Sequence, residues 1–128
     1  MRRMRHIATS AVRSFFKVLH NTADAQAAMM TLRPGQSSSD SVENEHPRCE
    51  QWCYVVAGNG RGTVGKRTVA LKPGSLLLIE KGEPHKVTNT GQKMLVTLNL
   101  YCPPAYRESG DVKLLARVPT LASTLKLK

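Results

Sequence analysis

Aromatic residues are scarce in this sequence and amount to 5% of its 128 residues. Proteins that bind single-stranded nucleic acids stack the bases on aromatic side chains set among basic ones, and this sequence lacks that arrangement. It also contains no apolar run approaching the ~20 residues of a membrane-spanning helix, and no internal repeat. These absences argue against a membrane protein, a repeat protein and a single-strand binder.

Acidic residues are few as well: nine Asp and Glu stand against 19 Lys and Arg, which gives a net charge of +10. A strongly basic protein is a candidate for nucleic-acid binding. However, the basic residues gather at the two ends of the chain, whereas most acids lie in segments 40–50 and 80–83. Because the middle of the chain is not a basic surface, nucleic acid is not the partner we expect.

The chain has only three cysteines, Cys49, Cys53 and Cys102. They cannot all pair with one another, and their spacing matches no CxxC zinc pair. We therefore predict reduced thiols and a cytoplasmic protein.

The length of the chain predicts one domain with a core of ordinary size. Residues 1–12 are basic and free of acids, and we expect a flexible basic N-terminal extension there. A transit-like presequence or a start codon placed too early would explain this segment equally well. We assign residues 13–106 to a barrel domain and residues 107–128 to an irregular C-terminal tail.

Short apolar or alternating segments, separated by Gly and Pro turns, follow one another along the domain. We predict strands at 14–20, 25–32, 51–57, 61–64, 66–71, 75–79, 85–89 and 94–101. No long amphipathic helix competes with them. The sequence therefore predicts an all-β sandwich or barrel.

Alternation along a strand indicates which residues share a face. If Gln51 points inward, so do Cys53, Val55 and Ala57, while Trp52 and its neighbours at 54 and 56 face the other side. We expect both sides of this strand to be packed. In the strand at 94–101, the residues on one face are Met94, Val96, Leu98 and Leu100.

Polar residues with ligating side chains occur in two segments. Asn44 and His46 precede the strand that begins at Gln51, and His85 follows the turn at 80–84, at the start of the next strand. Two imidazoles and a carboxamide inside a barrel suit a borderline first-row metal ion. On spacing alone, the alternative stays open that both histidines are ordinary loop and strand residues.

The segment from Gly74 to Asn89 resembles the second motif of the cupin superfamily. That motif runs Gly, five residues, Pro, one residue, Gly, two residues, His, three residues, Asn. Gly74, Gly82, His85 and Asn89 match it at full spacing, and Glu80 stands in the Pro position.

The first cupin motif is also present in part. It runs His, one residue, His, four residues, Glu, six residues, Gly. His46, Gln51 and Gly58 match the last three positions in spacing, with Gln51 in place of Glu, and Asn44 stands in place of the first His. The likeness to small single-domain bacterial cupins covers roughly Phe15 to Tyr106.

The resemblance implies a jelly-roll β-barrel or sandwich. It implies a metal site formed by His46, Gln51 and His85, with Asn44 as a further ligand, for Fe, Mn, Ni, Cu or Zn. Since Gln51 lacks the negative charge of Glu, a vacant polar cavity is the alternative. The expected pocket also includes Cys53, Tyr54, Val87 and Asn89. Cupins often pair edge strands, so we expect a homodimer through the strand around Phe15 and Phe16.

The resemblance leaves the reaction open. The chain would be a metal-dependent enzyme of the isomerase, dioxygenase or decarboxylase type, acting on a small polar molecule. The alternatives are a non-catalytic module that senses or stores a small ligand, and a metal-free epimerase with His85 or His46 as the base. The last of these needs a carboxylate to orient the histidine, and Glu83 is the near candidate in sequence.

Overall fold

The computed structural model describes residues 4–12, 14–39 and 47–106. Within these residues the chain forms a short 3-10 helix, η1 (Thr9–Ala11), and strands β1 (Phe16–Asn21), β2 (Gln26–Leu32), β3 (Glu50–Ala57), β4 (Gly60–Val64), β5 (Arg67–Leu71), β6 (Leu76–Ile79), β7 (His85–Asn89) and β8 (Leu95–Cys102). No helix in these ranges is long and apolar enough to cross a membrane. The predicted all-β fold is confirmed, and the expected tail at 107–128 lies outside the described residues.

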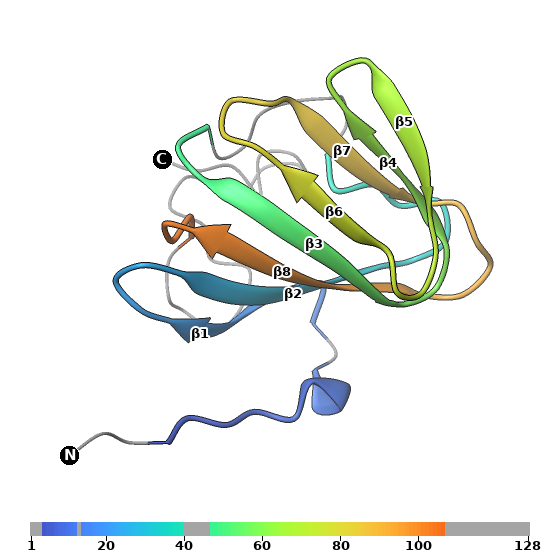
Figure 1. Ribbon diagram of the computed structural model, residues 1–128. Coiled ribbons are helices and arrows are strands. Elements are labelled where there is room, and N and C mark those ends of the chain that lie inside the picture. The colour runs from blue at the N-terminus through green and yellow to red at the C-terminus, as the bar shows by residue number, and fades with distance from the viewer. Residues whose placement is uncertain (1–3, 13, 40–46, 107–128) are drawn as a thin grey trace.

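The strands form two antiparallel sheets (Figure 1). The first has five strands in the order β1-β2-β8-β3-β6, and the second has three in the order β5-β4-β7. Non-sequential neighbours such as β2 and β8 are paired over the whole length of β2, from Gln26 opposite Tyr101 to Leu32 opposite Leu95. The chain passes between the two sheets from β3 to β4, from β5 to β6, from β6 to β7 and from β7 to β8, as in a jelly roll.

The core lies between the two sheets. Val55, Leu95 and Tyr101 from the five-stranded sheet form one buried cluster with Leu71 and Val87 from the three-stranded sheet. β1 and β2 add further apolar side chains to this cluster, namely Phe16, Val18, Ala28, Met30 and Leu32. Burial of these side chains is the main favourable contribution to folding.

The side chain of Gln26, the first residue of β2, is only 1% exposed. Its Oε1 accepts hydrogen bonds from the backbone N–H groups of Ala105 and Tyr106, and its Nε2 donates to the carbonyl oxygen of Tyr106. The Tyr106 ring in turn packs edge-on against Phe16 and Tyr101. The amide therefore holds residues 105–106 against the core as a strand partner would.

A close approach of two backbones fixes Gly58, which follows β3. Its φ of +88° lies in the left-handed region, which favours glycine. A Cβ atom at this position would also collide with the carbonyl oxygen of Met94. Gly58 is the last residue of the segment that resembles the first cupin motif, and the backbone geometry requires a glycine there.

The alternation predicted for β3 holds at Gln51, Cys53 and Val55, which are all buried. It ends there, because the register with β8 shifts between Val55 and Ala57, and Ala57 is exposed. The opposite face of β3 is not packed as expected, since Tyr54 is 43% exposed. The apolar face predicted for β8 belongs to this same outer face of the sheet. Its residues are Met94, Val96, Leu98 and Leu100.

Candidate functional site

The inner face of the five-stranded sheet carries a chain of buried polar side chains. The Nε2 of Gln51 donates to Oδ1 of Asn99 at 2.8 Å, and the Nδ2 of Asn99 lies 3.0 Å from Oγ1 of Thr97. Thr97 in turn donates to the carbonyl oxygen of Met30 at 3.3 Å. Gln51 is 4% exposed, and Thr97 and Asn99 are fully buried. Because replacing both partners of a buried hydrogen bond by apolar groups of the same shape can be nearly neutral, packing alone does not require these amides.

Cys53 lies within this polar strip, with Asn99 as its partner across the β3–β8 ladder. Burial raises the pKa of its thiol to about 12, and a hydrogen bond with Thr97 opposes that shift in part. The thiol is therefore protonated at neutral pH and does not supply a thiolate nucleophile.

His85 begins β7 on the three-stranded sheet, opposite Val64 of β4, and is 4% exposed. Burial lowers the pKa of its imidazole, and a backbone hydrogen bond and the charge of Glu83 oppose that shift. Its Nδ1 lies 2.9 Å from the carbonyl oxygen of Glu83, which can only accept. The neutral ring therefore carries its proton on Nδ1 and its lone pair on Nε2.

The expected orienting group for His85 was the Glu83 carboxylate, and the structure assigns this role to the Glu83 backbone. The Oε1 of Glu83 instead accepts from the backbone N–H of Glu80 at 3.3 Å, within the turn at 80–84. A backbone carbonyl fixes the tautomer of a histidine as a carboxylate does, but it adds no full negative charge.

Gln51 and His85 lie at the same end of the barrel. Gln51 pairs with Ile79, the last residue of β6, and the short turn at 80–84 leads from Ile79 to His85. Figure 1 shows the end of β6, the start of β3 and the start of β7 at this end. The other two predicted ligands, Asn44 and His46, lie outside the described residues.

A groove of about 250 Å³ borders this end of the site. It lies between the β4–β5 hairpin and β6, and its lining includes Gly62, Arg67, Leu77 and Glu83. β5 and β6 are the edge strands of their sheets. Because Glu83 both lines the groove and holds His85, the groove reaches the immediate surroundings of the imidazole.

The remaining residues of the predicted pocket have different positions. Val87 is buried in the core cluster, on the same face of β7 as His85. Asn89 is buried as well, but its Nδ2 donates to the carbonyls of Leu32 and Lys93, and its Oδ1 accepts from the N–H of Gly91. Tyr54 lies on the outer face, so the structure does not bring it together with the interior residues.

Sequence reasoning did not identify Asn99 and Thr97. They lie on β8 between Leu95 and Tyr101, and the apolar residues at alternate positions drew attention to the other face of that strand. The available signal was the polar side chain at every second position within an otherwise apolar strand. Strand pairing, which places Asn99 beside Cys53, was needed to interpret it.

The described residues provide a weak set of ligands for a divalent metal ion. Within 4–12, 14–39 and 47–106, no three His, Cys, Asp or Glu side chains gather closely enough to hold one. The interior contributes the neutral imidazole of His85, the neutral carboxamide of Gln51 and, within those ranges, no buried carboxylate. These residues by themselves do not fit a firmly bound divalent cation, which prefers anionic or several imidazole ligands.

Comparisons with known proteins agree with this architecture. A family model described as a cupin domain matches residues 28–101. A protein of Bacillus halodurans is 26% identical with a TM-score of 0.71, and the match covers 77% of each chain. A protein of Thermus thermophilus is 19% identical with a TM-score of 0.70, covering 78% of this chain and 98% of that one.

A third solved structure carries a functional description. It is a Thermotoga maritima protein described as a predicted oxalate decarboxylase, 26% identical with a TM-score of 0.57. The match covers 64% of this chain and 69% of that one. No curated protein matches the chain.

Proposed function

The chain belongs to the cupin family, and from that premise we propose that its barrel interior binds a small polar molecule near Gln51, Asn99 and His85. The observation that carries the proposal is the buried strip of amide and hydroxyl groups on the inner face of β3 and β8. Such groups replace apolar packing in the most protected part of the fold. Convergent polar groups in an otherwise apolar interior are typical of ligand sites.

The groove between the β4–β5 hairpin and β6 supports the same proposal. It brings solvent-accessible space to Glu83, the residue whose carbonyl oxygen contacts the His85 imidazole. The buried groups of the interior are neutral, because burial lowers the pKa of His85, and Gln51 and Asn99 are amides. We therefore expect a ligand rich in hydroxyl or carbonyl groups, bound by hydrogen bonds more than by charge.

The test uses a panel of small probes: monosaccharides, hydroxy acids and oxalate, the last suggested by the description of the Thermotoga maritima protein. Ligand-induced shifts of the melting temperature are measured for the native chain and for the double variant Gln51→Met/Asn99→Leu. We expect at least one probe to stabilise the native chain and not the variant. Saturable binding of the same probes to both proteins would contradict the proposal.

Metal binding by His46, Gln51 and His85, with Asn44, remains a prediction that needs its own measurement. The protein is purified without chelator or nickel resin, and bound Fe, Mn, Ni, Cu and Zn are measured before and after loading. Stoichiometric metal that is lost in His85→Ala would support the prediction. Substoichiometric metal under every loading condition would contradict it and leave hydrogen bonding as the means of holding a ligand.

A second candidate function is proton transfer by His85. The observation that favours it is the neutral imidazole whose Nδ1 proton is held by the carbonyl of Glu83, which directs the basic Nε2 away from that carbonyl. Such a base could take a proton next to a carbonyl group, as in an epimerase. Solvent deuterium exchange into a bound hydroxy acid or sugar, followed by NMR, would reveal this activity, and His85→Gln should abolish it.

We further propose that the protein is a homodimer. Support comes from exposed apolar side chains on the outer face of the five-stranded sheet, where Tyr54 pairs with Leu76, and Leu78 and Leu100 flank Trp52. Contiguous apolar surface of this kind is typical of protein interfaces. β1, the strand expected to pair, is the edge of this sheet.

A cytoplasmic location also stays a proposal. Cys49, Cys53 and Cys102 are free thiols in the structure, which suits a reducing compartment. Cells lysed directly in denaturant with an alkylating agent, followed by mass spectrometry, should show all three thiols reduced.

A further inference from the structure

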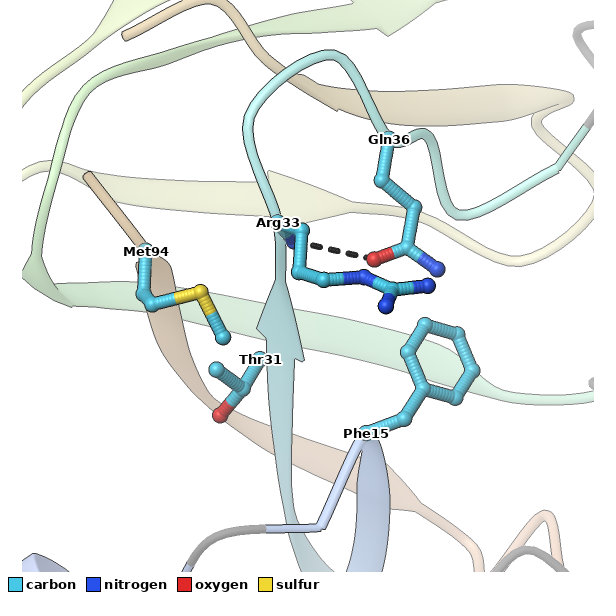
Figure 2. Close-up of a pocket in the computed structure, with 5 residues that line it drawn as sticks. All are labelled: Phe15, Thr31, Arg33, Gln36 and Met94. Atoms are coloured by element: carbon cyan, nitrogen blue, oxygen red, sulfur yellow. Dashed lines mark hydrogen bonds between the residues drawn. The ribbon is translucent and has the colours of Figure 1, made fainter. Parts of the chain in front are cut away.

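We propose that a pocket on the outside of the barrel, at the end of β2, binds a small aromatic carboxylate. The pocket has a volume of about 310 Å³ and is lined by Phe15, Thr31, Arg33, Gln36 and Met94 (Figure 2). It is separate from the polar interior: Met30 and Leu32 belong to the core cluster, so the intervening Thr31 lies on the other face of β2.

The polar groups of the pocket are donors. Arg33 contributes a guanidinium group, and no described residue forms a hydrogen bond or ion pair with it. Gln36 uses its Oε1 to accept the backbone N–H of Arg33 at 2.9 Å, which leaves its Nε2 as a donor. Among the described residues, no Asp or Glu lines the pocket. A site with a positive charge, amide donors and no carboxylate favours an anion, and the planar guanidinium matches a carboxylate in particular.

The backbone that carries the donors is held in place before any ligand arrives. Residues 33–36 form a turn in which the N–H of Gln36 donates to the carbonyl of Arg33. Two backbone hydrogen bonds join the same turn to Asn89 of β7. The N–H of Gly35 donates to the carbonyl of Asn89, and the N–H of Asn89 donates to the carbonyl of Gln36. Preorganisation of this kind lowers the entropic cost of binding.

The other walls are apolar. Figure 2 shows the Arg33 side chain extending toward the ring of Phe15, with Met94 on the other side of the end of β2. Phe15 is half-buried and packs against the core, whereas Met94 is 44% exposed. An aromatic ring and a thioether provide favourable contacts for a flat apolar ring. A carboxylate joined to an aromatic ring therefore matches both halves of the pocket, which inorganic anions do not.

The experiment compares 4-fluorobenzoate with 4-fluorobenzamide, which has the same shape and no charge. Binding to the full chain is followed by ¹⁹F NMR, and the chemical shifts of the methionine methyl groups locate the site. We expect saturable benzoate binding with a dissociation constant of about 1 mM, and at least tenfold weaker binding of the benzamide, since a hydrogen bond between charged groups is lost. The Met94 methyl signal should shift on binding, while that of Met30 in the core should not.

Two arginine variants make the matched test. Arg33→Gln should weaken benzoate binding about tenfold or more, because the charge that pairs with the carboxylate is lost. Arg61→Gln, which removes an exposed arginine of β4 outside the pocket, should leave binding unchanged. Equal affinity of the native chain and Arg33→Gln, or inorganic phosphate competing as strongly as benzoate, would overturn the proposal. A benzoate effect abolished only by Gln51→Met/Asn99→Leu would also overturn it and place the ligand in the barrel.

Discussion

The two faces of the five-stranded sheet depart from the usual distribution of side chains in opposite ways, although most of the buried face is apolar. The buried face carries Gln51, Thr97 and Asn99, whereas the exposed face carries large apolar side chains such as Leu76 and Leu100. An antiparallel sheet with one solvated face normally places apolar residues inward and polar residues outward. Folding requires neither departure, because replacing both buried amides by apolar groups of the same shape can be nearly neutral and contiguous exposed apolar surface is typical of interfaces. We assign the buried polar side chains to ligand binding and the exposed apolar side chains to contact with a second copy of the chain.

The largest expected effect comes from breaking the inner polar strip. Asn99→Ala removes the acceptor of Gln51 and leaves a cavity, and it should lower the free energy of unfolding by about 2–4 kcal/mol. The paired change Gln51→Met/Asn99→Leu removes both partners and should recover most of that loss. Urea denaturation measures all three proteins. If the double variant were less stable than Asn99→Ala, the amides would be needed for folding. The buried polar side chains would then need no explanation in terms of ligand binding.

The outer face should respond in the opposite way. Leu78→Lys/Leu100→Lys places two charges beside Trp52, and it should convert the proposed dimer to a monomer in analytical ultracentrifugation. Surface changes of this kind alter the stability of the isolated chain by only about 0.5 kcal/mol each. Lys86→Glu on β7 of the other sheet is a control that should not change the mass. A native chain that sediments as a monomer at micromolar concentration would remove the need for a partner on this face.

A smaller effect should appear in the pH dependence of stability. Burial lowers the folded-state pKa of His85 below its ordinary value of 6.5. The unfolded chain therefore takes up this proton first as the pH falls, so stability present above pH 6.5 is lost below it. Denaturation with EDTA present, between pH 8 and pH 5 (about the range in which histidine titrates), should show this loss. His85→Gln should flatten the curve in this range, and the half-buried His20→Gln serves as the control.

The smallest effect concerns the thiols and leaves stability unchanged. Because Cys53 is fully buried within the polar strip and its pKa is raised to about 12, it should resist iodoacetamide under native conditions. Cys102 is only half-buried and should react first. Peptide mass spectrometry gives the rates, with unfolded protein as the reference in which all three react. Rapid native labelling of Cys53 would mean that the inner face opens readily to solvent.

The strands and the inward direction of Gln51, Cys53 and His85 could be predicted from local alternation and from turn residues. The bulge that exposes Ala57 could not, because register depends on the partner strand, β8. Asn99 was missed for the same reason: which face of β8 is buried depends on its pairing with β2 and β3. The exposure of Tyr54 follows from its alternation with Cys53, but an apolar face on each side of β3 suggested packing on both.

The role of Glu83 shows a second limit of sequence reasoning. The sequence named the correct residue near His85 but favoured its carboxylate, because side-chain chemistry is what a sequence displays. The backbone carbonyl performs the task instead, and it would do so with almost any residue at this position. Metal binding could not be judged in the same way, because Asn44 and His46 lie outside the described residues.

The amide of Asn89 joins the ends of β2 and β7 to the turn before β8 through bonds to Leu32, Lys93 and Gly91. Asn89 therefore stabilises the fold, and its presence in the motif does not indicate which ligand the barrel binds. A comparison of sequences weighted toward Asn89 and Gly58 would therefore select proteins by fold more than by chemistry. A search weighted toward the pair Gln51 and Asn99 would instead gather proteins that share this interior, and their genomic neighbours would be the better guide to a ligand.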